Sequence, residues 1–220
     1  AFLAVALMDF GHTLSYSGMP NFVTPASAEK AISFSFAARA IAAFALLALA
    51  LRPWRALKHR QQRYLYLTIA LAGVLVLHWI FLFRAHWIPR TFIPGEGLTT
   101  FKIVIEYALF SAHLAAAWGF FRRVNQDDSQ MWGYLFAASC LMGASQLFTT
   151  FYSHPYDIHN FLAHAYRAVG YVLLYRALFI SGIREPYAAA RKLRDELDLS
   201  AQRLRALGAR VRDDIESERK

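Results

Sequence analysis

The stretch AEKAISFSFAARAIAAFALLALAL, residues 28–51, decides the fold. It is apolar over about the 20 residues that a helix needs to cross a bilayer, and beyond Lys30 its only charge is Arg39. It lacks the period-two alternation that is typical of a β-barrel strand. We therefore expect a spanning helix, because a helix satisfies its backbone hydrogen bonds internally within lipid.

Segments of similar length and character recur along the 220-residue chain. They cover 64–83, 101–121, 131–151 and 160–182, and 1–16 resembles the end of a further helix. Only 18% of the residues are charged, against about 25% in an average soluble domain. The chain is predicted to be an all-α, polytopic transmembrane bundle with at least six membrane segments. Because it starts within an apolar run and without Met, we also expect that an N-terminal portion is missing.

The charges concentrate in a short C-terminal tail. Residues 183–220 carry ten Lys or Arg and eight Asp or Glu. Within this tail one set of positions follows the 4-3-4-3-4 spacing of a coiled-coil seam: Leu193, Leu197, Ser200, Leu204, Leu207 and Val211. Ile215 then follows after four residues instead of three, a stutter that locally unwinds a supercoil. We expect a sensor bundle over 1–183 and a cytoplasmic, dimeric coiled-coil helix over 184–220; a solvated amphipathic helix is the alternative.

Loop charges predict the orientation of the bundle. The connections 52–63 and 122–129 and the exit after 182 are strongly basic, whereas 84–100 and 152–159 are weakly basic or lack Lys and Arg. Strongly and weakly basic loops alternate, as the positive-inside rule requires. The basic loops and the C-terminus are therefore predicted to be cytoplasmic, in a bacterial inner membrane.

Ionisable residues within membrane segments are costly and indicate function. With this orientation His12, Glu106 and His164 share a depth near the outer boundary, while Asp9, Arg39 and Arg167 lie deeper and could form a charge network. The predicted ligand or sensor pocket comprises Asp9, His12, Tyr16, Arg39, Lys102, Glu106, His164 and Arg167. For His78 and His113 a hydrogen bond to a neighbouring helix is the simpler interpretation.

Three kinds of ligand remain open for this pocket. His12, Glu106 and His164 could hold Zn²⁺, Fe²⁺ or Cu²⁺, and two facing histidines could ligate haem iron. The same groups could bind a small organic ligand through hydrogen bonds alone. No catalytic residues are assigned. The spacing does not decide, because no HxxxH, HExxH or CxxC pair is present.

Other classes of protein fit less well. The one cysteine excludes an internal disulfide framework. The net charge of +9 is explained by basic loops between spans, so no direct nucleic-acid partner is expected. A transporter would need polar residues in both halves of the bundle and repeated, broken helices. The expected partners are membrane lipid, a small-molecule or metal stimulus and a second copy of the chain.

Three ordered motifs resemble the class-three membrane-associated sensor domains of bacteria. They are DFGHTLSYSGMP at 9–20 with Ala38-Arg39 after it, GLTTFK with Glu106-Tyr107 in 97–107, and the pattern over 156–187 that includes Asn160, His164, Tyr166, Arg167 and Tyr171. The resemblance covers nearly all of 1–187. Three positions differ from the residues usual in the family but keep their broad chemistry: Phe36, Ala163 and Arg167.

The resemblance implies a membrane-embedded sensory input module upstream of an output domain. IESERK at 215–220 is similar to the lead-in to the dimerisation helix of nitrate-sensor-like histidine kinases. The chain itself is then not an enzyme, and the full-length protein is expected to be a histidine kinase. A diguanylate cyclase output is one alternative, and a metal-dependent membrane hydrolase is another.

Overall fold

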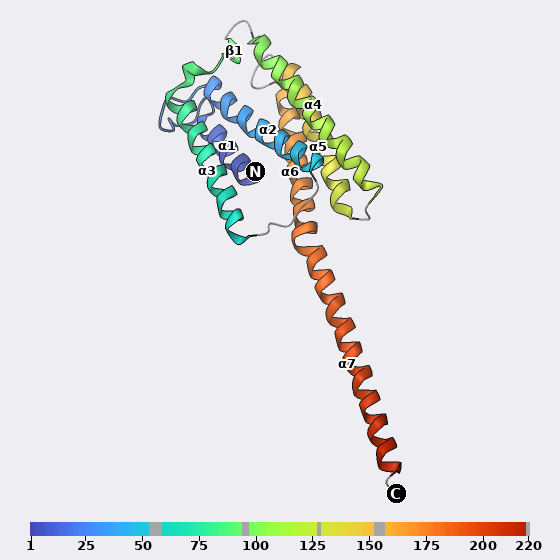
Figure 1. Cartoon of the computed structure of the whole chain (residues 1–220). Coiled ribbons are helices and arrows are strands. Elements are labelled where there is room, and N and C mark those ends of the chain that lie inside the picture. Colours follow the sequence, from blue (N-terminus) through green and yellow to red (C-terminus); the bar gives the residue numbers. More distant parts are fainter. Residues whose placement is uncertain (53–58, 94–96, 127–128, 152–156, 219–220) are drawn as a thin grey trace. The chain divides into compact units, whose positions relative to one another are not determined.

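The computed structural model describes the chain apart from residues 53–58, 94–96, 127–128, 152–156 and 219–220, and apart from the side chains of 60, 92 and 209–218. In the described part the long elements are all helices (Figure 1), which confirms the all-α prediction. They are α1 (Phe2–Ser15), α2 (Ala28–Leu51), α3 (Arg60–Phe83), α4 (Thr100–Val124), α5 (Gln130–Phe151), α6 (Ile158–Phe179) and α7 (Glu185–Glu218). Residues 53–58 of the basic connection 52–63, and residue 156 at the start of the last motif, lie outside the described part.

Three of the described helices are long and apolar enough to cross a membrane. They are α2, α3 from Gln61 onward, and α4, with 24, 23 and 25 residues. At 1.5 Å per residue each is about 35 Å long, which exceeds the roughly 30 Å hydrocarbon core. The chain is thus a membrane protein by this criterion, and the crossing of the membrane by further segments stays a prediction.

Helix α2 packs against α1, α3 and α4. Its start is fixed by Ser27, whose hydroxyl accepts a hydrogen bond from the Lys30 amide at 3.2 Å, as expected for an N-cap. Its buried surface is rich in alanine, and small residues let helices in membranes approach closely. At Gly119 of α4 a Cβ atom would lie only 2.9 Å from the Ala50 Cβ. The closest part of this interface therefore has room for glycine alone.

The loop before α4 places its first turns. A short antiparallel hairpin pairs β1 (Phe92–Ile93) with β2 (Gly97–Leu98). Thr99 then caps α4 by accepting from the Lys102 amide at 3.3 Å, and its hydroxyl donates to the Arg90 carbonyl at 2.8 Å. The position of Lys102 and Glu106 in the bundle is thus set by a helix start that is tied to the hairpin loop.

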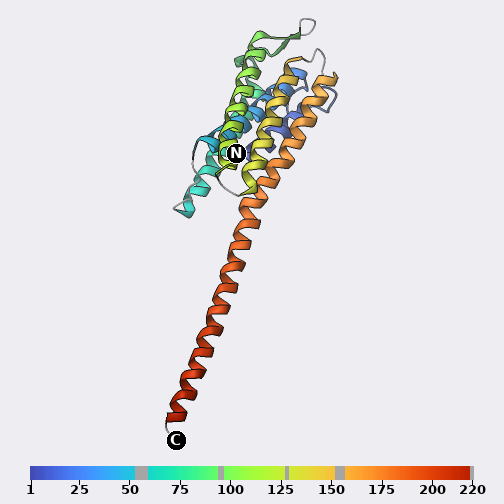
Figure 2. The ribbon, with the colours of Figure 1, turned by 90° about the vertical axis from the view of Figure 1, so that its right-hand side faces the viewer.

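Helix α6 lies against α5 within residues 1–174 (Figure 2). A Cβ at Gly170 would meet the Met142 side chain at 2.8 Å, and the rings of Phe148 and Tyr166 are 5.1 Å apart. Ala163, one of the three positions that differ from the residue usual in the family, is fully buried. Its methyl group is therefore accommodated inside the packed bundle.

The chain divides into two compact units, residues 1–174 and 175–220, whereas the sequence places the boundary at 183. In the second unit the π-helical turn η2 (Ile180–Arg184) joins the end of α6 to α7, and the Glu185 amide donates to the Ile180 carbonyl. The 34-residue α7 exposes its seam leucines. The side chains of Val211 and Ile215, on which the predicted stutter depends, lie outside the described part, and dimerisation stays a prediction.

Candidate functional site

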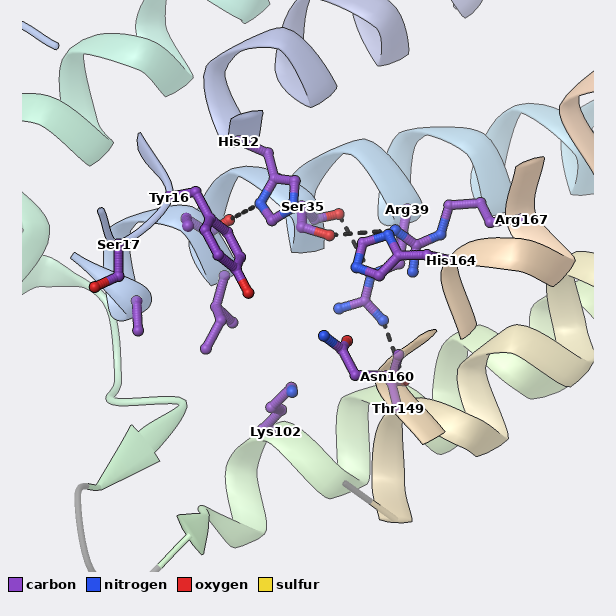
Figure 3. A pocket seen from close by; sticks show the side chains of 13 residues that line it. His12, Tyr16, Ser17, Ser35, Arg39, Lys102, Thr149, Asn160, His164 and Arg167 are labelled. Carbon is purple, nitrogen blue, oxygen red and sulfur yellow. Dashed lines mark hydrogen bonds between the residues drawn. The ribbon is translucent and has the colours of Figure 1, made fainter. Parts of the chain in front are cut away.

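A cavity of about 160 Å³ lies within the first unit (Figure 3). Side chains from α1, α2, α4, α5 and α6, together with the residues that follow α1, line it. These residues are His12, Tyr16, Ser17, Ala28, Ala31, Ile32, Ser35, Arg39, Lys102, Thr149, Asn160, His164 and Arg167. Segments far apart in the sequence therefore contribute to one polar cavity.

Helical periodicity explains how the site is assembled. Residues four apart lie on the same face of a helix. The lining contains such a pair from α2, Ser35 and Arg39, and another from α6, Asn160 and His164. On α4, Lys102 lies one turn before Glu106, which is buried beside the cavity. Each of these helices thus directs one polar stripe of an otherwise apolar surface toward the same place.

Arg39 connects three helices from the centre of the bundle. Its guanidinium forms an ion pair with Glu106 of α4, and the two side chains are 3% and 0% exposed. It also donates to the Gln146 Oε1 of α5 at 2.7 Å, and its Nε donates to the Ser35 carbonyl at 3.3 Å. Breaking a buried ion pair by removing one partner is strongly destabilising. The Arg39 side chain is therefore held in place from several directions.

Two imidazoles from α1 and α6 face each other across the cavity. The rings of His12 and His164 are nearly parallel, with centroids 6.0 Å apart and planes inclined by 16°. The His12 Nδ1 lies 2.7 Å from the Ala31 carbonyl oxygen, so this histidine is tied to α2. Tyr16 approaches the His12 ring edge-on at 6.1 Å. The aromatic side of the cavity is thus anchored to the start of α2.

Helix α6 is tied to α1 and α2 by polar contacts. The Tyr171 hydroxyl donates to the Asp9 carboxylate at 2.9 Å, and Arg167 donates to the Ser35 hydroxyl at 3.4 Å. Arg167 is 5% exposed, and its Nε has no hydrogen-bond partner among the described residues. A buried, incompletely paired guanidinium therefore faces the cavity.

The structure brings the predicted pocket residues together, with two differences. Six of the eight line the cavity: His12, Tyr16, Arg39, Lys102, His164 and Arg167. Asp9 and Glu106 lie behind this lining and bond to Tyr171 and Arg39. The expected charge network of Asp9 with Arg39 and Arg167 is wrong. Arg39 forms its ion pair with Glu106, and the Asp9 carboxylate accepts a hydrogen bond from the Tyr171 hydroxyl instead.

Sequence reasoning missed several uncharged site residues. Ser35, Thr149 and Asn160 line the cavity, and Gln146 bonds to Arg39 behind it. Helical spacing in the sequence could have indicated two of them, because Ser35 and Asn160 lie four residues before Arg39 and His164. Gln146 and Thr149 are likewise three apart on a largely apolar helix. A search for charged groups alone does not find such residues.

The predicted metal set is not assembled. In the described ranges no group of three His, Cys, Asp or Glu side chains is placed to hold a metal ion. Glu106, the carboxylate of the predicted set, does not line the cavity with the two histidines and forms an ion pair with Arg39. The haem alternative, which needs only the two histidines, stays a prediction.

The other two membrane histidines differ from the simpler interpretation given to them. His78 bonds within its own helix, with Nδ1 2.9 Å from the Val74 carbonyl oxygen. His113 is fully buried, and neither of its ring nitrogens has a hydrogen-bond partner in the part of the chain that the structure describes. Within the described residues, neither side chain forms a hydrogen bond to a neighbouring helix.

The architecture and the polar cavity are those expected of a membrane-associated sensor domain. A family model of this description, MASE3, matches residues 1–186, and the chain belongs to that family. Since these are sensor domains, the chain is indicated to be a sensor and not itself a catalyst. No curated protein matches the chain, and no solved structure matches it.

Proposed function

We propose that residues 1–183 are a sensory input module whose stimulus binds in the cavity between α1, α2, α4, α5 and α6. One observation carries the proposal: a chain of this sensor family contains a cavity whose lining includes Arg39, Lys102 and Arg167. Buried ionisable groups are costly in a membrane protein and mark functional sites. A packing role alone would be served better by apolar side chains, because replacing a buried ion pair with them is often stabilising.

Helix α6 is the element that passes the signal on. It contributes Asn160, His164 and Arg167 to the cavity, and its sequence continues into residues 175–220. A stimulus that prefers one packing of α6 shifts the population toward that packing. A change from mostly off to mostly on needs a preference of about 5.5 kcal/mol. Contacts with several buried charges can supply free energies of that size.

The C-terminal tail connects the sensor bundle to the output domain. Residues 184–220 form a parallel, dimeric, cytoplasmic coiled coil that leads to a histidine kinase; a diguanylate cyclase is the alternative output. The heptad spacing supports dimerisation, and so does the exposure of Leu193, Leu197 and Leu204 on a single chain, at 58–69%. The protein lies in a bacterial inner membrane with the cavity near the outer side.

The cavity's role is tested by removing one imidazole at a time. His12→Ala and His164→Ala, each in the full-length protein, are expected to change basal output or the response, measured as autophosphorylation in membranes. His78→Ala is the matched control, because His78 is a membrane histidine outside the cavity lining. Unchanged output in both cavity variants would remove the cavity from the mechanism.

The orientation is tested by labelling introduced cysteines in a Cys140→Ser background. Met19→Cys, in the loop after α1, is expected to react with a membrane-impermeant maleimide in spheroplasts. Gln126→Cys, after α4, should react only once the membrane is opened. Both native side chains are exposed in the structure. The reverse pattern would invert the proposed topology.

The metal-dependent hydrolase has no supporting observation in the described part of the chain, where no three-residue ligand group is found.

A further inference from the structure

The cavity lining carries positive charge without a negative counterpart in the same lining. Arg39, Lys102 and Arg167 are 3%, 2% and 5% exposed. Among the described residues that line the cavity there is no Asp or Glu. A guanidinium stays protonated in proteins, and a buried charge is expensive unless it is paired. The cavity is therefore electrostatically prepared for an anion.

The neighbouring carboxylates do not pair with Arg167. Glu106 forms its ion pair with Arg39, and the Asp9 carboxylate accepts from Tyr171. Another ion pair among the described residues joins Asp157 and His159. Arg167 has a single long hydrogen bond, to the Ser35 hydroxyl at 3.4 Å, and its Nε has none. The strongest unsatisfied donor at the cavity is consequently this guanidinium.

The rest of the lining favours an organic anion over an inorganic one. Ala28, Ala31 and Ile32 of α2 give the cavity an apolar wall. Its volume of about 160 Å³ is close to that of an engineered apolar cavity, about 150 Å³, that admits benzene. The planar fork of an arginine matches the two oxygens of a carboxylate. A cavity of this size, lined by both arginine and apolar side chains, fits a carboxylate with a compact apolar body.

We infer that the cavity binds a small organic carboxylate, with its oxygens on Arg167 and its apolar part against α2. This inference rests on the proposed sensory function and names the chemical class of the stimulus. Figure 3 shows Arg167, His164, Asn160 and Lys102 around the same space. A bound carboxylate connects α6 to α2 and α4 through these groups. Without it, Arg167 has no acidic partner among the described residues.

A second, more open hollow provides the route of entry. It is about 860 Å³ and shares lining residues with the cavity: His12, Tyr16, Ser17, Asn160 and His164. Asp157, which contacts His159, also lines the hollow. A longer acyl chain could extend from the cavity into this space. A free aromatic acid and a membrane fatty acid therefore share the proposed chemistry and are distinguished by experiment.

The test measures thermal unfolding of the full-length protein in nanodiscs, with benzoate, benzamide and decanoate at constant ionic strength. Benzoate is expected to raise the melting temperature in proportion to the logarithm of its concentration, while its uncharged isostere benzamide binds at least about tenfold more weakly. A decanoate effect larger than that of benzoate would identify a fatty acid as the source of the carboxylate. Equal effects of benzoate and benzamide, or no effect of either acid, would overturn the inference.

The variants locate the carboxylate. Arg167→Gln should weaken benzoate binding by about 10- to 100-fold, the value of a charge-assisted hydrogen bond. Arg167→Lys should recover part of it, and Arg176→Gln on the same helix, outside the cavity lining, should leave it unchanged. The comparison of benzoate with benzamide uses the unaltered protein, so it tests the inference even if a variant fails to fold.

The two proposals fail separately. If no carboxylate binds while His12→Ala and His164→Ala alter output, the sensory cavity stands and the ligand class is wrong. If benzoate binds through Arg167 while both histidine variants signal normally, the cavity is a binding site without the proposed sensory role.

Discussion

Replacing Glu106 by Gln should destabilise the bundle, because it leaves the Arg39 guanidinium buried without its carboxylate. Both side chains are at most 3% exposed, so solvent cannot replace the lost partner. Removing one member of a buried ion pair costs about 3–5 kcal/mol. Since Gln keeps one acceptor oxygen and Gln146 still accepts from Arg39 at 2.7 Å, we expect the lower value, about 3 kcal/mol. For a chain of this size that corresponds to a melting temperature lower by roughly 6–12 °C.

The assay is thermal unfolding in detergent, with two further variants. Glu29→Gln removes an exposed carboxylate at the start of α2 and should change stability by less than about 0.5 kcal/mol. Arg39→Met with Glu106→Leu removes both charges, and should recover at least half of the loss, because an apolar pair can replace a buried ion pair at little cost. A Glu106→Gln protein that melts like the Glu29→Gln control would refute the idea that this pair holds the bundle together.

Three further results are expected. In the cysteine-free background, Leu204→Cys should form an intermolecular disulfide readily in membranes and Arg205→Cys should not, since only the former lies on the predicted seam; equal cross-linking would contradict a specific dimer. Gly119→Ala should destabilise by about 1–3 kcal/mol in thermal unfolding because its Cβ would meet that of Ala50 at 2.9 Å, whereas Gly73→Ala, with open space around it, should be neutral or stabilising. Purified protein should show neither a Soret band nor stoichiometric metal by elemental analysis if the ligand is a carboxylate, and a haem spectrum would favour paired ligation by His12 and His164.

The sequence predicts that His12 and His164 lie close to each other, and the structure places the centroids of their rings 6.0 Å apart. The membrane orientation used for that argument stays a prediction, and the direction of a side chain around its helix could not be predicted. The same reasoning grouped Arg39 with Asp9 and Arg167, whereas Arg39 pairs with Glu106. The pairing with Glu106, 67 residues away, depends on how α2 and α4 are rotated against each other.

Uncharged polar residues were the other source of error. Gln146 and Thr149 of α5 carry no charge and were passed over, although both bond to Arg39. A guanidinium has five donors, so a buried Arg with one carboxylate implies further acceptors nearby. Looking for amides and hydroxyls at helical spacing on the remaining segments would have found them. The heptad pattern of the tail predicts a helix without reference to any neighbour, and the structure shows one in α7, while its dimerisation stays a prediction.

The π-helical turn η2 has a mechanical consequence for the long helix α7 that comes after it. Such a turn accommodates one residue more than a regular α-turn, and each residue of an α-helix advances the azimuth by about 100°. Conversion of Ile180–Arg184 to α-geometry would swivel the leucine edge of α7 by roughly that angle relative to residues 175–179. If α7 dimerises along this leucine edge, as proposed, such a rotation would change which residues meet at the dimer contact.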